Sequence, residues 1–134
     1  MEEFAGAVIY KNLKDPSVML VHQVGRRKNS WTFPMVQVDS DEDPVQAIRK
    51  ELREGFGIVP EDLSYLGDIT FGAGKKRLHC SVGRVANATR LVDHRLDIDD
   101  VQFFDLSDAR RLMTKKEQLL IDSLQSLLSM TRSA

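Results

Sequence analysis

Cysteine is almost absent from this sequence of 134 residues, since Cys80 is the only one. A single thiol cannot close a disulfide within the chain, and it excludes zinc or iron–sulfur sites built from several cysteines. Long apolar runs are absent too, because no stretch approaches the roughly 20 residues that cross a bilayer. An excess of one charge is also missing, because 19 Lys and Arg residues stand against 20 Asp and Glu residues. These absences exclude a disulfide scaffold, a membrane-spanning helix and a strongly basic DNA-coating protein.

The composition that remains is that of an ordinary globular protein, with 42% hydrophobic and 29% charged residues. Such a length suits one domain of about 100–150 residues, and no repeat or linker divides it, so residues 1–134 are expected to form a single domain. The first residues, Met1 to Phe4, are acidic where a secretory signal is basic. We therefore expect a cytoplasmic protein with no membrane partner, in which Cys80 is a buried packing residue.

Apolar runs bounded by turn residues predict five strands. They are expected at residues 5–10, 18–24, 63–71, 78–85 and 101–104. Residues 72–76 are expected to form a hairpin tip between the third and fourth of these strands. With the helices described next, the order is strands, helix, strands, helices, which predicts a layered α+β domain.

The clearest helix signal begins at Asp43, a favourable N-cap residue. Pro44 suits the first helical position, and Gln46 is expected to complete a capping box with Asp43. Gly55 and Gly57 supply the expected stop of this helix.

Two further helices are expected near the C-terminus. Ser107 is the expected cap of a short helix that reaches Met113, and Thr114 is the expected cap of a longer helix from Lys115 to about Met130. The expected apolar face of the longer helix consists of Leu119, Leu120, Leu124, Leu127 and Leu128. We expect this face to pack within the molecule. A dimer surface is the alternative, and both a monomer and a homodimer stay open.

A pattern of charged residues and glycines overlaps the first helix. Glu42, Lys50, Glu51, Glu54 and Gly57 are spaced as in the signature G-x5-E-x7-R-E-U-x-E-E-x-G-U, in which U is a bulky aliphatic residue. In these residues, and in the Trp-Thr-Phe-Pro segment that precedes them, the sequence resembles the Nudix hydrolase family. An Ala-Gly-Ala-Val first strand and an acidic segment before the C-terminal helices extend the resemblance over nearly the whole chain.

The resemblance implies a Nudix-type α/β/α sandwich with a mixed β-sheet. It also implies a divalent-metal-dependent pyrophosphohydrolase of nucleoside diphosphate-linked compounds, with Mg²⁺ or Mn²⁺ as cofactor. By the same resemblance, Glu51 and Glu54 would bind metal and serve catalysis, Glu42 would be a further ligand, and Lys50 would orient Glu51. The chemistry is reasonable, because residues three apart share a helix face and carboxylates are the ligands that Mg²⁺ prefers.

Substrate phosphates need cations, and one basic segment precedes the signature. Arg26, Arg27, Lys28 and Trp31 are the expected substrate-binding residues, with a solvated turn as the alternative. Residues 75–77 give a second basic segment at the expected hairpin tip. The expected ligand is a small-molecule nucleotide, with RNA as a further candidate.

Three departures from the signature bear on activity. Val36 replaces the first glycine, Lys50 replaces arginine, and Gly55 replaces the second glutamate of the adjacent pair. Losing one of three carboxylates weakens a metal site, and the acidic residues that could compensate are Asp97, Asp99 and Asp100. Activity is therefore expected to be weakened or altered. The alternative is a catalytically inactive module that binds nucleotide, RNA or protein, with Glu51 and Glu54 as solvated charges.

Overall fold

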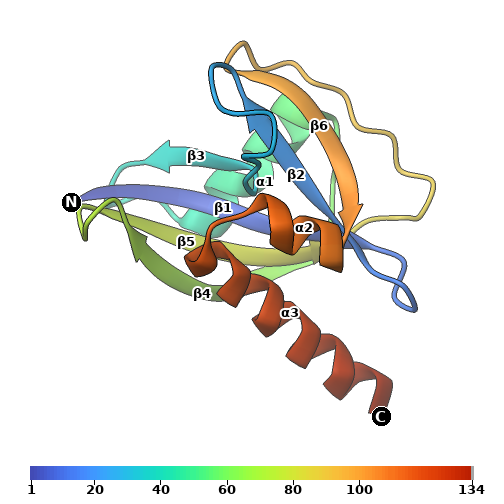
Figure 1. The fold of residues 1–134 in the computed structure, drawn as a ribbon. Helices are drawn as coiled ribbons and strands as arrows, with labels where there is room; N and C mark the ends of the chain where they lie inside the picture. Colours follow the sequence, from blue (N-terminus) through green and yellow to red (C-terminus); the bar gives the residue numbers. More distant parts are fainter. Residues whose placement is uncertain (134) are drawn as a thin grey trace.

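Within residues 1–133, six strands form one mixed sheet that three helices cover (Figure 1). The structure is a computed structural model that describes residues 1–133, and their side chains as far as Ser129. In chain order the elements are β1 (Glu2–Lys11), β2 (Ser17–Gln23), β3 (Met35–Val38), α1 (Pro44–Phe56), β4 (Glu61–Phe71), β5 (Lys76–Arg84), β6 (Ile98–Asp105), α2 (Leu106–Leu112) and α3 (Lys115–Ser133).

The strands lie in the order β4-β5-β1-β2-β6, and β3 pairs with β1 outside this path. Strand β1 runs parallel to β5 and antiparallel to β2 and β3, so the sheet is mixed. The first half of β1 pairs with β3, whereas only Tyr10 and Lys11 at its end pair with β2. In the segment between β2 and β3, Thr32 forms an isolated antiparallel bridge to Val21 of β2.

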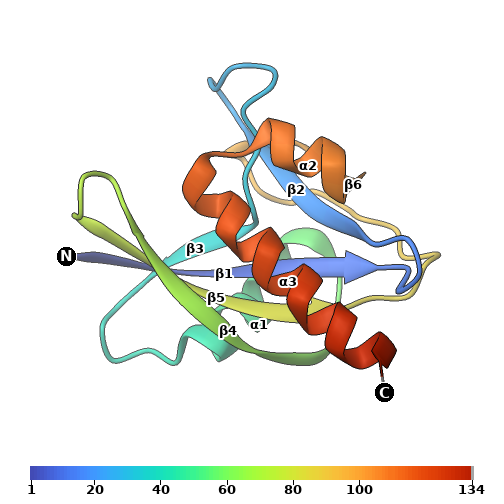
Figure 2. The same ribbon diagram turned by 60° about the horizontal axis from the view of Figure 1, so that its bottom comes forward.

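Helix α1 lies on one face of the sheet, and α2 and α3 lie on the other (Figures 1 and 2). The alternation of side chains along β1 serves both layers. Ala5, Ala7 and Ile9 pack on the α1 side, whereas Val8 packs with Leu124 of α3. The expected α/β/α sandwich of the α+β class is therefore confirmed. Among the described residues, no helix combines the length and the apolar character that crossing a membrane requires.

Helix α1 begins and ends near the expected residues, with two differences. Asp43 is the N-cap, but its carboxylate accepts from the Val45 N–H at 3.0 Å rather than forming a box with Gln46. Gly57 ends the helix with a φ of 71°, a conformation that glycine adopts without steric cost. Gly55 is a buried residue within the helix, so the prediction that it helps to stop α1 is wrong.

The C-terminal helices correct two details. Asp105 caps α2 by accepting from the Asp108 N–H at 2.8 Å, so the prediction that Ser107 is the cap is wrong. Thr114 precedes α3 as expected, where the Glu117 N–H donates to its hydroxyl at 3.3 Å.

The apolar face of α3 is rotated slightly from the expected one. Leu120, Ile121, Leu124 and Leu128 are buried, whereas Leu119 is 57% exposed and Leu127 is 39% exposed. The spacing of five leucines did not indicate Ile121, which completes the buried stripe. Strand β3 was also not predicted, because its four residues are too short a run for a periodic pattern.

Candidate functional site

The signature glutamates lie on one side of α1, as their spacing predicts, but in different surroundings. The side chain of Glu51 is 20% exposed, whereas Glu54 is exposed and has no ion pair with a described residue. Lys50 is also exposed and makes no described contact with Glu51. The partner of Glu51 comes from the connection between β5 and β6.

Arg95 lies against the carboxylate of Glu51. Its Nη1 atom is 3.3 Å from Oε1 of Glu51, and the same nitrogen donates to the Met35 carbonyl at 2.8 Å. On its other edge, Nε and Nη2 donate to the two carboxylate oxygens of Asp97 at 2.9 and 2.6 Å. The guanidinium is therefore held by a forked pair with Asp97, a carbonyl and the signature glutamate.

The absence of a side chain at position 55 makes room for this arginine. A Cβ atom built on Gly55 would lie 2.8 Å from Oε1 of Glu51 and 3.3 Å from Cγ of Arg95. Two backbone bonds hold the connection against the end of α1: the His94 N–H donates to the Gly55 carbonyl at 2.9 Å, and the Val92 N–H donates to the Phe56 carbonyl at 3.2 Å. Gly55 is thus a packing position under the connection.

As arranged, these residues do not fit a divalent metal. The signature's third carboxylate is absent at Gly55, and the Glu51 carboxylate faces a guanidinium. Within residues 1–133, no group of three or more His, Cys, Asp or Glu side chains is placed to hold a metal ion. Glu42 lies in the turn before α1, where its carboxylate accepts from the Asp39 N–H at 2.9 Å.

The acidic residues considered as replacements have other partners. Asp97 pairs with Arg95, the carboxylate of Asp99 lies 2.6 Å from Nδ1 of His22, and Asp100 accepts from the Gln102 amide at 2.8 Å. Of the three, Asp97 is therefore the one that a direct contact links to the Glu51 site, and Arg95 makes that link.

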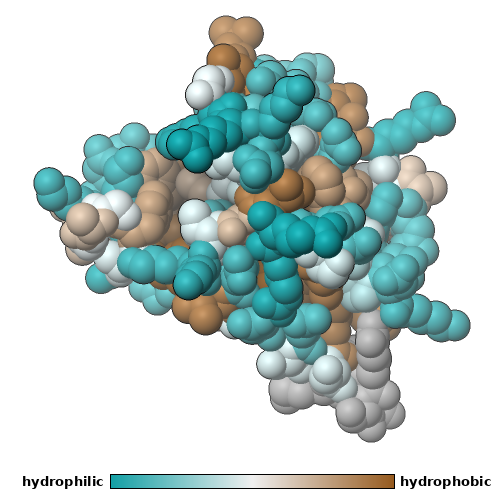
Figure 3. All heavy atoms as spheres, in the orientation of Figure 1, coloured by the Kyte–Doolittle hydropathy of each residue, from teal (hydrophilic) through white to brown (hydrophobic). Residues whose placement is uncertain are grey.

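A groove of about 870 Å³ lies on the face that carries α2 and α3. This volume suits a small-molecule site. Apolar surface lies among hydrophilic side chains on this face (Figure 3). The apolar and aromatic residues of the groove come from four parts of the chain, and they include Phe4, Trp31, Met35, Ile69, Phe71 and Leu78. Met35 joins the groove to the α1 site, because its carbonyl accepts from Arg95.

The groove is rich in cations. Its lining includes one carboxylate, that of Glu117, and six basic side chains: Arg26, Arg27, Lys76, Arg111, Lys115 and Lys116. Glu117 is engaged by the hydroxyls of Thr32 and Thr114. A strongly positive lining of this kind attracts anionic ligands such as phosphates.

Three of the four expected substrate-binding residues line this groove. Arg26, Arg27 and Trp31 lie there, whereas Lys28 is exposed outside the lining and accepts from the Trp31 indole N–H at 2.9 Å through its carbonyl. The indole also packs edge-on against Phe104, with ring centroids 4.8 Å apart. Trp31 is thus fixed in place at the groove.

His22 contacts the backbone of the basic loop that contains Arg26, Arg27 and Lys28. Its Nε2 lies 2.7 Å from the Arg27 carbonyl, and its Nδ1 lies 2.6 Å from a carboxylate oxygen of Asp99. Both partners are acceptors, so this geometry favours an imidazolium with an N–H on each nitrogen. The Arg27 carbonyl, and after it the Asp99 carboxylate, raises the pKa of His22 above its usual 6.5.

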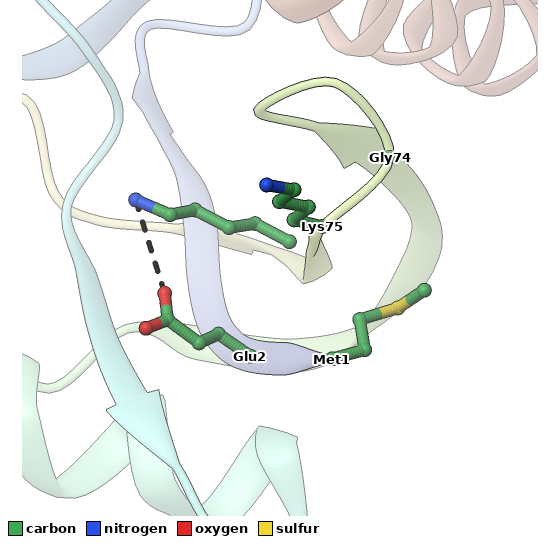
Figure 4. Close-up of a pocket in the computed structure, with 5 residues that line it drawn as sticks. Met1, Glu2, Gly74 and Lys75 are labelled. Atoms are coloured by element: carbon green, nitrogen blue, oxygen red, sulfur yellow. Dashed lines mark ion pairs between the residues drawn. The ribbon is translucent and has the colours of Figure 1, made fainter.

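The expected basic hairpin tip lies next to the groove. Residues Met1, Glu2, Gly74, Lys75 and Lys76 surround a smaller pocket, where Nζ of Lys76 is 3.8 Å from the Glu2 carboxylate (Figure 4). Lys76 also lines the large groove. Cys80 is buried as expected, and burial raises the pKa of its thiol to about 12.

The sequence pattern did not indicate a role for Arg95 or for the basic residues where α2 meets α3. Arg95 lies within an acidic segment, and this indicated that it would pair with an acidic residue. Because it is far from α1 in the sequence, the pattern did not indicate that Glu51 is one of its partners. Arg111, Lys115 and Lys116 were also visible as paired cations. Only the packing of α2 and α3 against the sheet brings them to the groove.

Comparison with known proteins gives a consistent family. A family model described as the NUDIX domain matches residues 4–124. An RNA pyrophosphohydrolase of Xanthomonas campestris pv. campestris (strain B100) is 44% identical over 41 residues, which are 31% of this chain and 20% of that protein. One from Stenotrophomonas maltophilia (strain K279a) is 42% identical over 41 residues, with the same two coverages. The matched segment therefore spans about a fifth of the length of these curated relatives.

Solved structures with similar folds cover nearly the whole chain. The NUDIX domain of Shewanella oneidensis NrtR, complexed with ADP ribose, has a TM-score of 0.78 and 18% identity, covering 94% of this chain and 87% of that one. A C. elegans Ap4A hydrolase binary complex has a TM-score of 0.79 and 23% identity, covering 96% and 98%. At these identities the likeness establishes the fold.

Proposed function

This chain belongs to the NUDIX domain family, and from that premise we propose that it binds a nucleoside diphosphate linked to another group, without efficient hydrolysis. The groove supports this proposal, because it combines aromatic and apolar residues with six cationic side chains. A nucleotide has the same two parts, an apolar base face and an anionic diphosphate. Two structural neighbours, a NUDIX domain complexed with ADP ribose and an Ap4A hydrolase, indicate the ligand class to test.

In this proposal the base lies among the apolar residues, and the diphosphate lies toward the basic loop. Arg26, Arg27 and Lys115 have no ion pair with any described residue, so their charges are available to a ligand. Arginine is well suited to this role, because its planar fork matches phosphate oxygens at two points. Trp31 lies beside these cations and offers its ring to the ligand.

Pyrophosphate hydrolysis is the second candidate, and two observations favour it. Glu51 and Glu54 keep the signature spacing, and the curated relatives are named as RNA pyrophosphohydrolases. The family and these relatives support pyrophosphohydrolase activity in general. The arrangement around α1 supports it less, because Arg95 engages Glu51 and position 55 has no carboxylate. The same relatives make RNA a second ligand to test.

Calorimetric titration with ADP-ribose, diadenosine tetraphosphate and a 5′-triphosphorylated RNA tests the binding proposal. We expect micromolar or tighter binding of at least one ligand, and a loss of about tenfold or more in the variant with both Arg26→Ala and Arg27→Ala. Lys14→Ala is the matched control, because Lys14 is exposed in the β1–β2 turn and away from the groove lining. No binding of any of the three would contradict the proposal.

Turnover of the same compounds with Mg²⁺ or Mn²⁺ separates the two candidates. We expect no product above that of a Glu51→Gln variant, which removes the signature carboxylate. Product formation by the natural chain that Glu51→Gln abolishes would establish the hydrolase instead.

A further inference from the structure

The oxygens around Arg95 are of the chemical types that bind hard metal ions, but here they surround a guanidinium. A backbone carbonyl and two carboxylates converge on its guanidinium, with N–O distances from 2.6 to 3.3 Å. Carbonyl and carboxylate oxygens are the ligands that hard divalent cations take. We infer that Arg95 is the built-in cation of this site, and that the domain consequently binds its anionic ligand without a divalent metal.

The position of Arg95 is fixed by the backbone around it. Its own N–H donates to the Asp93 carboxylate at 3.0 Å, and its neighbour His94 donates to the Gly55 carbonyl at 2.9 Å. The carbonyl of Gly55 lies in the last turn of α1, where carbonyls lack partners within the helix. The β5–β6 connection thus caps the end of α1, and the same contacts place the Arg95 guanidinium beside Glu51.

Gly55 and Arg95 are mutually dependent. The position of a Cβ at residue 55 lies 3.3 Å from Cγ of Arg95, which is tighter than most real contacts, and 3.4 Å from Cδ of Arg95. A glutamate at position 55 would direct its carboxylate into the volume that the arginine stem fills. The departure from the signature at Gly55 is therefore coupled to the presence of Arg95.

A metal ion would have to displace this guanidinium. Arginine keeps its charge at any pH at which the protein folds, so it does not vacate the site by losing a proton. Its side chain is 22% exposed, and its forked pair with Asp97 would be broken by displacement. Binding a divalent ion here therefore carries a cost that a site of free carboxylates does not have.

The phosphates of a ligand are then neutralised by the groove's own cations. The α1 site and the groove meet at Met35, which lines the groove and whose carbonyl accepts from Arg95. With Arg95 balancing Glu51, the nearby acids repel an approaching diphosphate less. This step rests on the proposed binding function, whereas the exclusion of metal does not.

Direct measurement of Mn²⁺ binding by electron paramagnetic resonance tests the inference. We expect the natural chain to leave millimolar Mn²⁺ free. The double variant Gly55→Glu with Arg95→Ala is expected to bind Mn²⁺ at least about tenfold more tightly than either the natural chain or Gly55→Glu alone. Arg90→Ala is the matched control, since Arg90 belongs to the same connection but is exposed and has no ion pair with a described residue.

Each outcome decides the inference. Tight Mn²⁺ binding by the natural chain would overturn it, and this arm needs no variant to fold. Equal Mn²⁺ binding by Gly55→Glu alone and by the double variant, both folded by circular dichroism, would also overturn it. If the double variant fails to fold, the Glu51→Gln variant is measured in its place. We expect this variant to bind Mn²⁺ as weakly as the natural chain does. A loss of Mn²⁺ binding relative to the natural chain would overturn the inference. A failure to bind any nucleotide would contradict the proposed function, but the Mn²⁺ measurements would still test the role of Arg95.

Discussion

The side chain of Arg95 packs against Gly55, where the family signature has a glutamate. Arg95 also engages Glu51, so the signature residues surround a guanidinium. The sequence showed that a carboxylate is missing at Gly55, and it indicated Asp97 as one replacement. The structure brings Asp97 to the site, but with a guanidinium between it and Glu51. This could not be derived from spacing, because it depends on how the β5–β6 connection packs on α1. Lys50, expected to orient Glu51, is instead exposed.

His22 gives a prediction at the scale of one residue. Its folded pKa is raised above 6.5, so its contribution to stability is fully present below that pH and is lost as pH rises through the raised value. We expect the free energy of unfolding to fall in this window, and the decline to be smaller in His22→Gln. Urea unfolding at several pH values measures this.

His94→Gln is the matched control for this prediction. His94 is exposed and its side chain has no described partner, so His94→Gln removes an imidazole without breaking a described contact. A His22→Gln variant with the same pH dependence as the natural chain would show that the two acceptors do not hold a proton on this ring.

At the scale of elements, most of the fold could be predicted because most elements carry local signals. Residue periodicity, Asp43 and Gly57 placed α1, and turn residues placed the β4–β5 hairpin. Strand β3 lacked such a signal, since its four residues are ordered by pairing with β1. The groove lining was also beyond prediction, because α2 and α3 contribute to it only after packing on the sheet.

The junction between α1 and the β5–β6 connection gives a prediction about Gly57. This residue has a φ of 71°, and a Cβ there would lie 2.8 Å from Cγ2 of Val92. We expect Gly57→Ala to lower the free energy of unfolding by more than the roughly 1–2 kcal/mol of left-handed strain. Thermal or urea unfolding measures the change.

Gly74→Ala separates strain from packing in this comparison. Gly74 has a φ of 80°, but no heavy atom of a described residue other than its chain neighbours lies within 4 Å of its Cβ position. Its substitution therefore reports left-handed strain alone. If the two alanine variants lose equal stability, the Val92 side chain does not pack against Gly57 as described.

For the whole molecule, a net charge of −1 conceals an uneven distribution. Six cations line the groove, while acids gather around α1 and the start of β6. A net charge of −1 spread evenly over the surface would repel a nucleotide slightly. The six cations of the groove are instead expected to attract the nucleotide at short range.

Ionic strength tests this distribution. We expect nucleotide affinity to fall steadily as salt rises, because salt screens exposed charges over about 10 Å at 0.1 M. Emission from Trp31, the only tryptophan of the chain, provides the titration signal from within the groove. Affinity that does not change with salt would mean that the basic lining does not contact the ligand.

The proposed role of Arg95 is to replace the metal ion in this NUDIX domain. Nucleotide affinity measured by calorimetry with Mg²⁺, and again with the chelator EDTA, tests it most directly. With Arg95 in place, we expect the two dissociation constants to agree within about twofold. A loss of affinity of about tenfold or more in EDTA would contradict it.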